Sequence, residues 1–325
     1  MRPIVVRLPV CNGLHYLKQS VESVLAQSFH DFDFLILDDS STDGSWEYLS
    51  GFNDPRITLW RNSVNKGLFY NLNQMIQRSN SPLIKLWAQD DIMYPNCLEE
   101  VLSFHARYPG IGFSYSERDI IDQAGRVITP KVADHTPELI SPELHARIAF
   151  FVGSIAGNIA NVTLSRAALE KVGLFREDMR ISGDFDMWVR LAQNHPVGFI
   201  HSRLIQLRDH AGQLSRQEEY FIFHLREDME VYQYLLGYVS PGTRAEGRRL
   251  LRRFKLLFYY TLMVKAILKG HFRTAAEFFS MLSRFDNIGI LTLSFVWNRV
   301  MRAKRYKSAL NDNGGVVIPK QRDCA

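Results

Sequence analysis

Cysteine is scarce in this chain. The 325 residues include three cysteines, Cys11, Cys97 and Cys324, which are odd in number and far apart. Disulfide-stabilised domains carry dense, paired cysteines, and structural zinc sites need cysteine or histidine ligands at short spacing. The sequence therefore argues against both kinds of site and predicts a protein of a reducing compartment.

Long hydrophobic runs are absent as well. The N-terminal sequence MRPIVVRLPVCN is interrupted by Arg7, and it is too short and too charged for the apolar core of a secretory signal. The runs LLFYYTLMV and IGILTLSFVW, nearer the C-terminus, fall short of the ~20 residues that span a bilayer. We therefore expect a cytoplasmic protein that begins with a buried strand.

The usual glycine-rich phosphate-binding loops are also missing. Neither GxxxxGK(S/T) nor GxGxxG follows the first apolar segment. This absence excludes the common loops of P-loop and dinucleotide-binding enzymes. It also weakens the case for a nucleotidyltransferase on a related fold, because PVCNGLHYLK lacks the basic glycine-rich loop expected there.

The chain does have ample apolar content and an uneven charge. Hydrophobic residues make up 46% of the sequence, enough for a full-sized core. The net charge of +5 divides into 19 Lys/Arg against 10 Asp/Glu from Arg216 onward, and 20 against 24 before it. We therefore predict two parts: a catalytic domain of residues 1–215 and a basic helical region of residues 216–325.

Strand and helix patterns alternate over the first 125 residues. Apolar runs rich in β-formers predict strands at 4–10, 32–37, 57–60, 83–87 and 111–115. Apolar residues at helical spacing predict helices over 14–25 and 68–78. Residues 126–150 have the composition of a polar connection, and a further helix is expected around 185–192. This order predicts an α/β fold with a mostly parallel sheet flanked by helices.

Acidic residues follow several predicted strands. Ligands bind at the carboxyl ends of strands in such sheets, where these side chains would gather. A single pair of aspartates is typical of a turn or helix cap, but three sets favour a shared cation. Carboxylates suit Mg²⁺ or Mn²⁺, which also bind phosphate oxygens. The three sets are Asp38/Asp39, Asp90/Asp91 and Asp184/Asp186.

A series of short motifs gives the chain a family resemblance over roughly residues 3–216. Their order resembles that of the inverting family 2 glycosyltransferases, which have the GT-A fold and act in bacterial surface-polysaccharide synthesis. Each motif is weak alone, and the order and spacing of eight carry the resemblance. They read PVCN, QSVESVLAQSF, ILDDSSTDGSWEYL, NSVNKGLFYNLNQ, LIKLWAQDDIMYPNCLE, VGLFRE, GDFDMWVRLA and LRDHAGQLS.

The resemblance implies a nucleotide site. Pro9 and Asn12 would shape the loop beside the nucleotide, and Asp39, with Asp38 next to it, matches the aspartate that hydrogen-bonds the base. Asp91 would lie next to Asp90, either supporting that residue as a metal ligand or facing the ribose. Three further residues match the stretch that flanks the nucleotide, namely Asn65, Gly67 and Asn73.

The resemblance also implies a metal and a base. Asp90 matches the last aspartate of the family's DxD motif, which binds Mg²⁺ or Mn²⁺ on the donor's diphosphate, and His210 matches a histidine near that metal. Asp184 matches the general base that deprotonates the acceptor hydroxyl. The sequence departs from the pattern at Ala88, where the first aspartate of DxD is common, and at two further positions. These are Gly183, in place of a glutamate, and Cys11, in place of a tyrosine.

The basic region has two interpretations. Between Arg244 and Lys307 lie 15 Lys/Arg and three acidic residues, interleaved with apolar runs. Such helices either lie on the inner face of a membrane or pack on the catalytic domain with their basic faces in solvent. The first alternative implies a peripheral membrane protein. Nucleic acid is not expected as a partner, because no recognition motif accompanies the charge.

These patterns together predict an inverting, metal-dependent glycosyltransferase. It would move a sugar from a nucleotide-diphosphate donor to a hydroxyl of a glycan or lipid-linked acceptor. Ala88 and Gly183 leave an alternative open, a degenerate protein that binds sugar nucleotides or acts as a scaffold without turnover.

Overall fold

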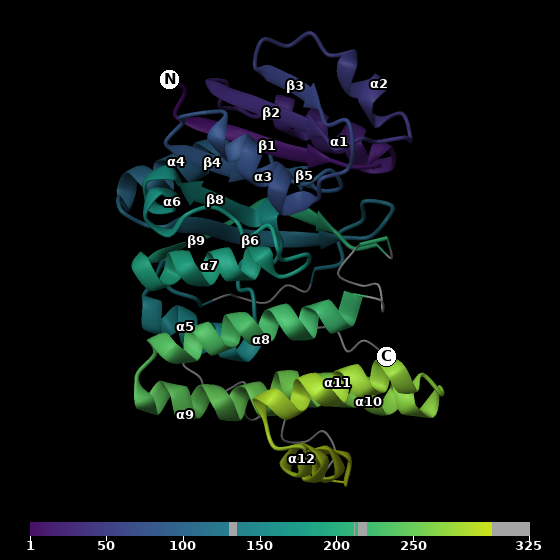
Figure 1. The fold of residues 1–325 in the computed structure, drawn as a ribbon. Helices are drawn as coiled ribbons and strands as arrows, with labels where there is room; N and C mark the ends of the chain where they lie inside the picture. The colour runs from purple at the N-terminus through teal and green to yellow at the C-terminus, as the bar shows by residue number, and fades with distance from the viewer. Residues whose placement is uncertain (130–134, 211, 214–219, 301–325) are drawn as a thin grey trace. The chain divides into compact units, whose positions relative to one another are not determined.

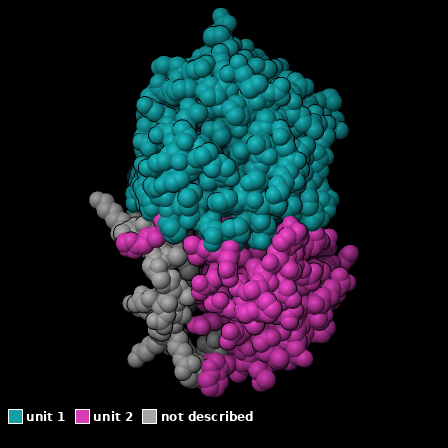
Figure 2. All heavy atoms as spheres, turned by 90° about the vertical axis from the view of Figure 1, so that its left-hand side faces the viewer, with its two compact units in different colours: residues 1–131, 137–142, 156–213 teal, residues 132–136, 143–155, 214–325 magenta. Residues whose placement is uncertain are grey.

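The structure is a computed structural model that describes residues 1–129, 135–210, 212–213 and 220–300 (Figure 1). It divides into two compact units (Figure 2). Unit 1 comprises residues 1–131, 137–142 and 156–213, and unit 2 comprises residues 132–136, 143–155 and 214–325. We keep residue 215 as the proposed boundary between functional domains.

The sheet of unit 1 begins with four parallel strands. They lie in the order β3-β2-β1-β4, with β1 at Ile4–Val10, β2 at Phe32–Asp38, β3 at Ile57–Arg61 and β4 at Leu83–Leu86. These bounds agree with the predicted strands to within one residue at each end. Because β1 pairs with both β2 and β4, the carboxyl ends of these three strands lie side by side.

The rest of the sheet is mixed. The nine-stranded order continues from β4 through β8, β6 and β9 to β5, and β7 pairs with β9. Four of the eight pairings are antiparallel, so the predicted parallel arrangement holds for the first half and for β6 with β9. The added strands are β5 at Ile92–Met93, β6 at Phe113–Ile121, β7 at Leu139–Ile140, β8 at Val162–Ser165 and β9 at Val197–Arg208.

Helices cover this sheet and close its core. The helix α1 buries Leu17, Val21 and Val24 as its apolar spacing predicts, whereas Leu14 in its first turn is 37% exposed. The predicted helix at 68–78 is confirmed as α3 and that at 185–192 as part of α7. The helices of unit 1 are α1 (Leu14–Leu25), α2 (Ser45–Ser50), α3 (Leu68–Gln77), α4 (Cys97–Arg107), α6 (Arg166–Val172) and α7 (Gly183–Asn194), with a short 3₁₀ turn η1 at Ile159–Asn161.

The prediction of a polar connection over 126–150 is wrong for its last part. Residues Pro142–Val152 form helix α5, which buries Ile148, Ala149 and Phe150. Proline at the first position and good helix formers after it favour this helix. Proline content alone was therefore a poor guide here.

Unit 2 is helical where the structure describes it, as the sequence predicts. Its core includes Leu235, Tyr232 and Leu282, and Tyr232 donates a hydrogen bond to the carbonyl of Ala149 in α5. None of the described helices is both long and apolar enough to cross a membrane. Besides α5, its helices are α8 (Phe221–Tyr238), α9 (Pro241–Leu250), a π-helical stretch η4 (Leu251–Leu256), α10 (Leu257–Leu268), α11 (Phe272–Phe285) and α12 (Ile288–Val300).

A partly buried histidine makes unit 1 sensitive to acid. The imidazole Nε2 of His105 in α4 lies 3.0 Å from Ser114 Oγ, and burial lowers the pKa of His105 to about 4. The unfolded chain binds this proton near pH 6.5, so stability falls as the pH drops from 6.5 towards 4. Between pH 7 and pH 5 the free energy of unfolding should therefore fall by about 2 kcal/mol less in His105→Gln than in wild type.

Urea unfolding followed by tryptophan fluorescence measures this difference, because four of the five tryptophans lie in unit 1. The matched control is His30→Gln, since His30 is exposed. Equal pH dependence of wild type and His105→Gln would contradict the prediction.

Candidate active site

The loops after β1 and β2 are locked together. Asn12 Oδ1 accepts a hydrogen bond from the backbone N–H of Thr42 (2.8 Å), and the N–H of Asn12 donates to Ser41 Oγ (2.9 Å). Asn12 and Ser40 have φ of 49° and 62°, and they are the non-glycine residues with positive φ in the described part of the chain. Such strained backbone is concentrated at functional sites and needs surrounding contacts to hold it.

Gln89 clamps the first of these loops to the end of β4. Its Oε1 accepts from the N–H of Cys11 at 2.9 Å, and its Nε2 donates to the carbonyl of Cys11 at 3.1 Å. A Cβ at Gly13 would collide with Gln89 Oε1, so a larger residue there would displace the Gln89 amide from this clamp. Gln89 belongs to the polar cluster that ends in Asp90 and Asp91, but no role was predicted for it from the sequence.

Asp39 organises the third loop at the carboxyl ends of β1, β2 and β4, and we call this end of the sheet the rim. Its carboxylate accepts from the side-chain amide of Asn62 (2.8 Å) and from the backbone N–H groups of Lys66 and Gly67 (both 2.9 Å). Gly67 has φ of +87° and directly precedes α3. Asn65, in the same loop, donates to Cys11 Sγ at 3.1 Å. Asp39 thus brings Asn65 and Gly67 beside the loop that follows β1.

Asp38 is completely buried beneath this rim. One carboxylate oxygen accepts from the N–H of Ser41 (3.1 Å) and pairs with Arg61 Nε (2.9 Å). The other oxygen has no hydrogen-bond partner within the described residues. The immediate effect of Asp38 is therefore to fix the turn that carries Ser40 and Ser41. Pro9, which pairs with Leu37 in the sheet, continues β1 up to the loop.

Asn73 lies in α3 and bonds to a distant segment, and its predicted place beside the nucleotide stays a prediction. The residue is 3% exposed, and its amide is engaged with a distant segment. Its Oδ1 accepts from the N–H of Phe175, while its Nδ2 donates to the Phe175 carbonyl and to Glu177 Oε1. Through these hydrogen bonds Asn73 holds the VGLFRE segment, residues 172–177, against α3.

Asp90 and His210 meet at the end of β4, across 119 intervening residues. Asp90 Oδ2 lies 2.9 Å from His210 Nε2, and their side chains are 22% and 16% exposed. The two atoms are at hydrogen-bond distance, and a carboxylate oxygen and an imidazole nitrogen are both ligand types that would suit a divalent cation. No group of three or more acidic, histidine or cysteine side chains within the described ranges could hold a metal by itself.

Asp91 and Arg208 form the buried support of that pair. Asp91 accepts from the N–H of Arg208 (2.8 Å) and from Asn158 Nδ2 (3.1 Å). Burial, aided by the charge of Asp90, raises the pKa of Asp91 to about 8. Asp91 is fully buried, so the structure gives it a supporting position beneath the rim.

The guanidinium of Arg208 reaches three other parts of the rim. It donates to the Asp90 carbonyl (2.9 Å), to the carbonyls of Asp122 and Gln123 (both 3.1 Å) and to Gln19 Oε1 (2.8 Å). Its centre lies 4.4 Å from the ring centroid of Tyr16, whose ring also packs 5.2 Å from that of His210. The side chain is 2% exposed.

Asp184 lies in the first turn of α7, on the side of α3. One of its oxygens accepts from the N–H of Phe185 at 2.7 Å. A Cβ on the preceding Gly183 would lie 2.7 Å from the ring of Phe69, two residues after Gly67. This contact brings the start of α7 to the start of α3 and hence to the loop held by Asp39. Asp186 instead pairs with Arg190 at 2.7 Å.

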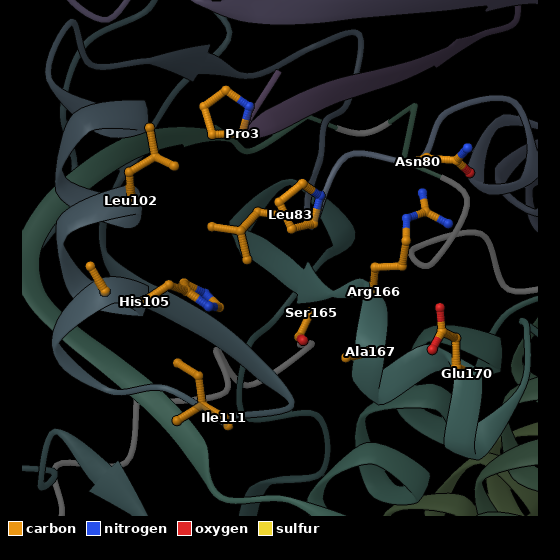
Figure 3. A pocket seen from close by; sticks show the side chains of 13 residues that line it. Pro3, Asn80, Leu83, Leu102, His105, Ile111, Ser165, Arg166, Ala167 and Glu170 are labelled. Carbon is orange, nitrogen blue, oxygen red and sulfur yellow. The ribbon is translucent and has the colours of Figure 1, made fainter. Parts of the chain in front are cut away.

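The hollow in Figure 3 lies at the opposite edge of the sheet. Its volume is about 480 Å³, and it is lined by Pro3 before β1, Leu83 at the start of β4, and residues of α4 and α6. Arg166, at its margin, donates to the carbonyls of Ile76, Ser79 and Ser81. The carboxylates of the rim are all at the other ends of the strands, so the candidate active site is the rim.

Comparison with known proteins agrees with this assignment. Residues 5–159 match the model of Glycosyl transferase family 2. This segment is a family 2 glycosyltransferase domain of the GT-A type. The chain is 25% identical over 231 residues to the uncharacterized glycosyltransferase RP339 of Rickettsia prowazekii, covering 67% of this chain and 69% of the relative. It is 29% identical over 192 residues to the putative colanic acid biosynthesis glycosyl transferase WcaA of Escherichia coli, covering 58% and 65%.

Solved structures share the fold of the glycosyltransferase. S. aureus TarS 1–349 superposes with a TM-score of 0.63 at 15% identity, covering 95% of this chain and 92% of that one. TarS has also been solved with UDP-GlcNAc, where the TM-score is 0.61 at 16% identity over 78% and 71% of the two chains. The mannosyltransferase PcManGT of Pyrobaculum calidifontis, in complex with GDP-Man and Mn²⁺, gives a TM-score of 0.51 at 12% identity over 91% and 87%.

The contact between Gly183 and Phe69 predicts a large effect from a single methyl group. Gly183→Ala should destabilise the protein by about 1–3 kcal/mol, because the Phe69 ring is 4% exposed and has little room to move. The control is Gly237→Ala in α8, where a Cβ meets nothing within 4 Å. That substitution should stabilise by about 0.5–1 kcal/mol. Chemical denaturation measures both, and equal effects of the two variants would disprove the packing argument.

Arg208 gives a second test of the rim. Arg208→Lys keeps the charge and the backbone bond to Asp91 but loses the planar fork, leaving buried carbonyls without donors. We expect a loss of about 2–4 kcal/mol. Arg203→Lys, on the same strand but 34% exposed, should cost less than about 1 kcal/mol. Urea unfolding followed by tryptophan fluorescence measures both values. An Arg208→Lys variant as stable as wild type would show that the bonds of the Arg208 guanidinium are not needed for stability.

Proposed function

We propose that this glycosyltransferase moves a sugar from a nucleotide-diphosphate donor to a hydroxyl of a glycan or lipid-linked acceptor, with inversion and with a divalent metal, in bacterial polysaccharide synthesis. One observation carries the proposal. The Asp90–His210 pair, the loop held by Asp39 and the start of α7 with Asp184 all belong to one edge of the sheet. The family membership and the relative WcaA support the same reaction class and pathway type.

The donor set fits a divalent cation. Asp90 and His210 would supply one oxygen and one nitrogen, leaving the other positions to diphosphate oxygens and water, as is usual for ions bound with nucleotides. Such an ion, when bound, offsets the negative charge that develops on the departing diphosphate. Both Mg²⁺ and Mn²⁺ are candidates, and the imidazole nitrogen favours Mn²⁺ over the strictly oxygen-seeking Mg²⁺.

The residues of the chain would do the remaining work. Asp184 accepts the proton of the acceptor hydroxyl as its oxygen attacks the anomeric carbon from the face opposite the diphosphate, which inverts that carbon. The Asp39 loop, with Asn65 and Gly67, holds the nucleoside in a fixed orientation. Asp91 and Arg208 keep Asp90 in place without touching the donor.

The donor nucleotide is proposed to be a uridine diphosphate sugar. The support is the fold shared with TarS, which has been solved with UDP and with UDP-GlcNAc. A guanosine diphosphate sugar is the competing donor, because the fold is also shared with PcManGT in complex with GDP-Man and Mn²⁺.

A non-catalytic sugar-nucleotide-binding protein is the second candidate. The observation that favours it is Phe69, whose ring occupies the space that the family's glutamate side chain would need at position 183. This loss removes one carboxylate from the acceptor side. Asp184 and the Asp90–His210 pair are retained, and so we rank the enzyme first.

Transfer assays separate the two candidates. Asp184→Asn should lower kcat at least a hundredfold, because general-base catalysis contributes about 10²–10⁴. The matched control is Asp178→Asn, an aspartate five residues beyond Gly173 that is paired with Arg176 and exposed. Wild type that binds a nucleotide yet neither transfers nor hydrolyses any donor would favour the second candidate.

Thermal-shift measurements test the metal and the base. Wild type should be stabilised by UDP with Mn²⁺ by about 2.7 kcal/mol at a hundredfold excess over the dissociation constant. Asp90→Ala should lose the metal-dependent part, whereas Asp184→Asn should keep it. A stronger shift with GDP would reassign the base, and no shift with any nucleotide would contradict the proposed donor site.

A further inference from the structure

The last described helix of unit 2, α12, is apolar on two opposite faces. On its inner face Leu291 is fully buried, Phe295 packs on Tyr260 with ring centroids 5.2 Å apart, and Thr292 Oγ1 lies 2.8 Å from the Tyr260 hydroxyl. The opposite face carries four large side chains that are 41–72% exposed. They are Ile290, Leu293, Val296 and Trp297, which we call the outer stripe of α12.

Helical geometry explains why these residues form one stripe. At about 100° per residue, Ile290, Leu293 and Trp297 fall within 60° of one another, and Val296 extends the stripe along the same side. No charged residue occurs from Ile288 to Asn298. A helix that is apolar all round is normally buried in a core or in a membrane. The outer stripe therefore calls for an apolar partner.

Neighbouring helices repeat the pattern. Nine of the eighteen exposed large hydrophobic side chains in the described ranges lie between Phe258 and Trp297. Leu268 and Phe272, which flank the turn between α10 and α11, are 82% and 68% exposed. The described part of the chain thus concentrates exposed apolar side chains in the C-terminal helices of unit 2.

The charge of the sequence on both sides of the stripe favours one kind of partner. Residues 241–297 contain ten Lys/Arg and three Asp/Glu, and five more basic residues follow within ten positions of Trp297 in the sequence. A second copy of this chain would bring the same positive charge against it, which is unfavourable. An anionic bilayer combines negatively charged head groups with apolar acyl chains beneath them. Its head groups attract basic clusters, and its acyl chains accept the apolar face of a neighbouring helix. The five residues are Arg299, Arg302, Lys304, Arg305 and Lys307.

We propose that α12 lies in the surface of an anionic lipid bilayer, with its outer stripe at the boundary between head groups and acyl chains. The helix has 13 residues, too few to span a bilayer and enough to lie along one. Trp297 suits this depth, because its ring is apolar and its N–H reaches the head groups. The inference deepens the proposed function, since it would hold the enzyme where a lipid-linked acceptor resides.

Vesicle co-sedimentation of the full chain tests the proposal. Wild type should bind vesicles of phosphatidylglycerol and phosphatidylcholine, bind pure phosphatidylcholine weakly, and lose binding as salt is added. The double variant Leu293→Glu/Trp297→Glu should bind the anionic vesicles about tenfold less or weaker still. The control Tyr238→Glu changes an exposed side chain of α8 that is 60% accessible, close to the 58% of Trp297, and should bind like wild type.

Three outcomes would overturn the proposal. The first is equal binding by wild type and the double variant. In the second, wild type does not bind but self-associates in sedimentation velocity, and the double variant does not, so a second copy covers the stripe. In the third, wild type neither binds nor self-associates, so the chain covers the stripe itself. The readout is independent of catalysis, because Asp184→Asn should bind vesicles normally, and the double variant should still act on a water-soluble acceptor.

Discussion

The buried guanidinium of Arg208 is the interaction on which the rim of the sheet depends. It stands at the end of β9 and bonds to the carbonyl of Asp90, to the turn at 122–123 and to Gln19 of α1. An arginine so buried is stable only when its donors are satisfied, and the fork supplies directed bonds that one lysine amine could not. Because its backbone N–H also holds Asp91, one residue sets the end of β4 relative to β9.

The same arrangement explains why the site needs no glycine-rich cradle. Three loops are fixed by side-chain bonds to backbone groups: Asn12 holds the loop after β2, Gln89 holds the loop after β1, and Asp39 holds the loop before α3. In each case a side chain fixes the conformation of a backbone segment. These bonds also hold Asn12 and Ser40 at the positive φ angles that the loops require. Positive charge for a diphosphate would then come from a cation at Asp90 and His210.

Local patterns predicted the first half of the sheet closely and the rest poorly. Strands β1 to β4 are apolar runs bounded by polar residues, so period and composition were enough. Strands β5 and β7 have two residues each, too short for any periodic signal, and helix α5 was hidden by flanking prolines. The order of the motifs predicted that Asp90 and His210 share a site. The direction in which a side chain points depends on tertiary packing, which motif order does not reveal. Asn73 therefore turned out to hold Phe175, and the clamp formed by Gln89 was not foreseen.

Ala88 and Gly183, the two departures from the family pattern that suggest a loss of activity, are both well packed. Ala88 packs against the core, and its carbonyl accepts a hydrogen bond from Ser20 at 2.8 Å. The space above Gly183 is filled by Phe69, which stacks on Phe175 with ring centroids 5.7 Å apart. Both replaced positions are therefore packed, and the carboxylates that we propose for the metal and for the base are retained beside them. This retention supports the proposed enzyme over the proposed non-catalytic protein.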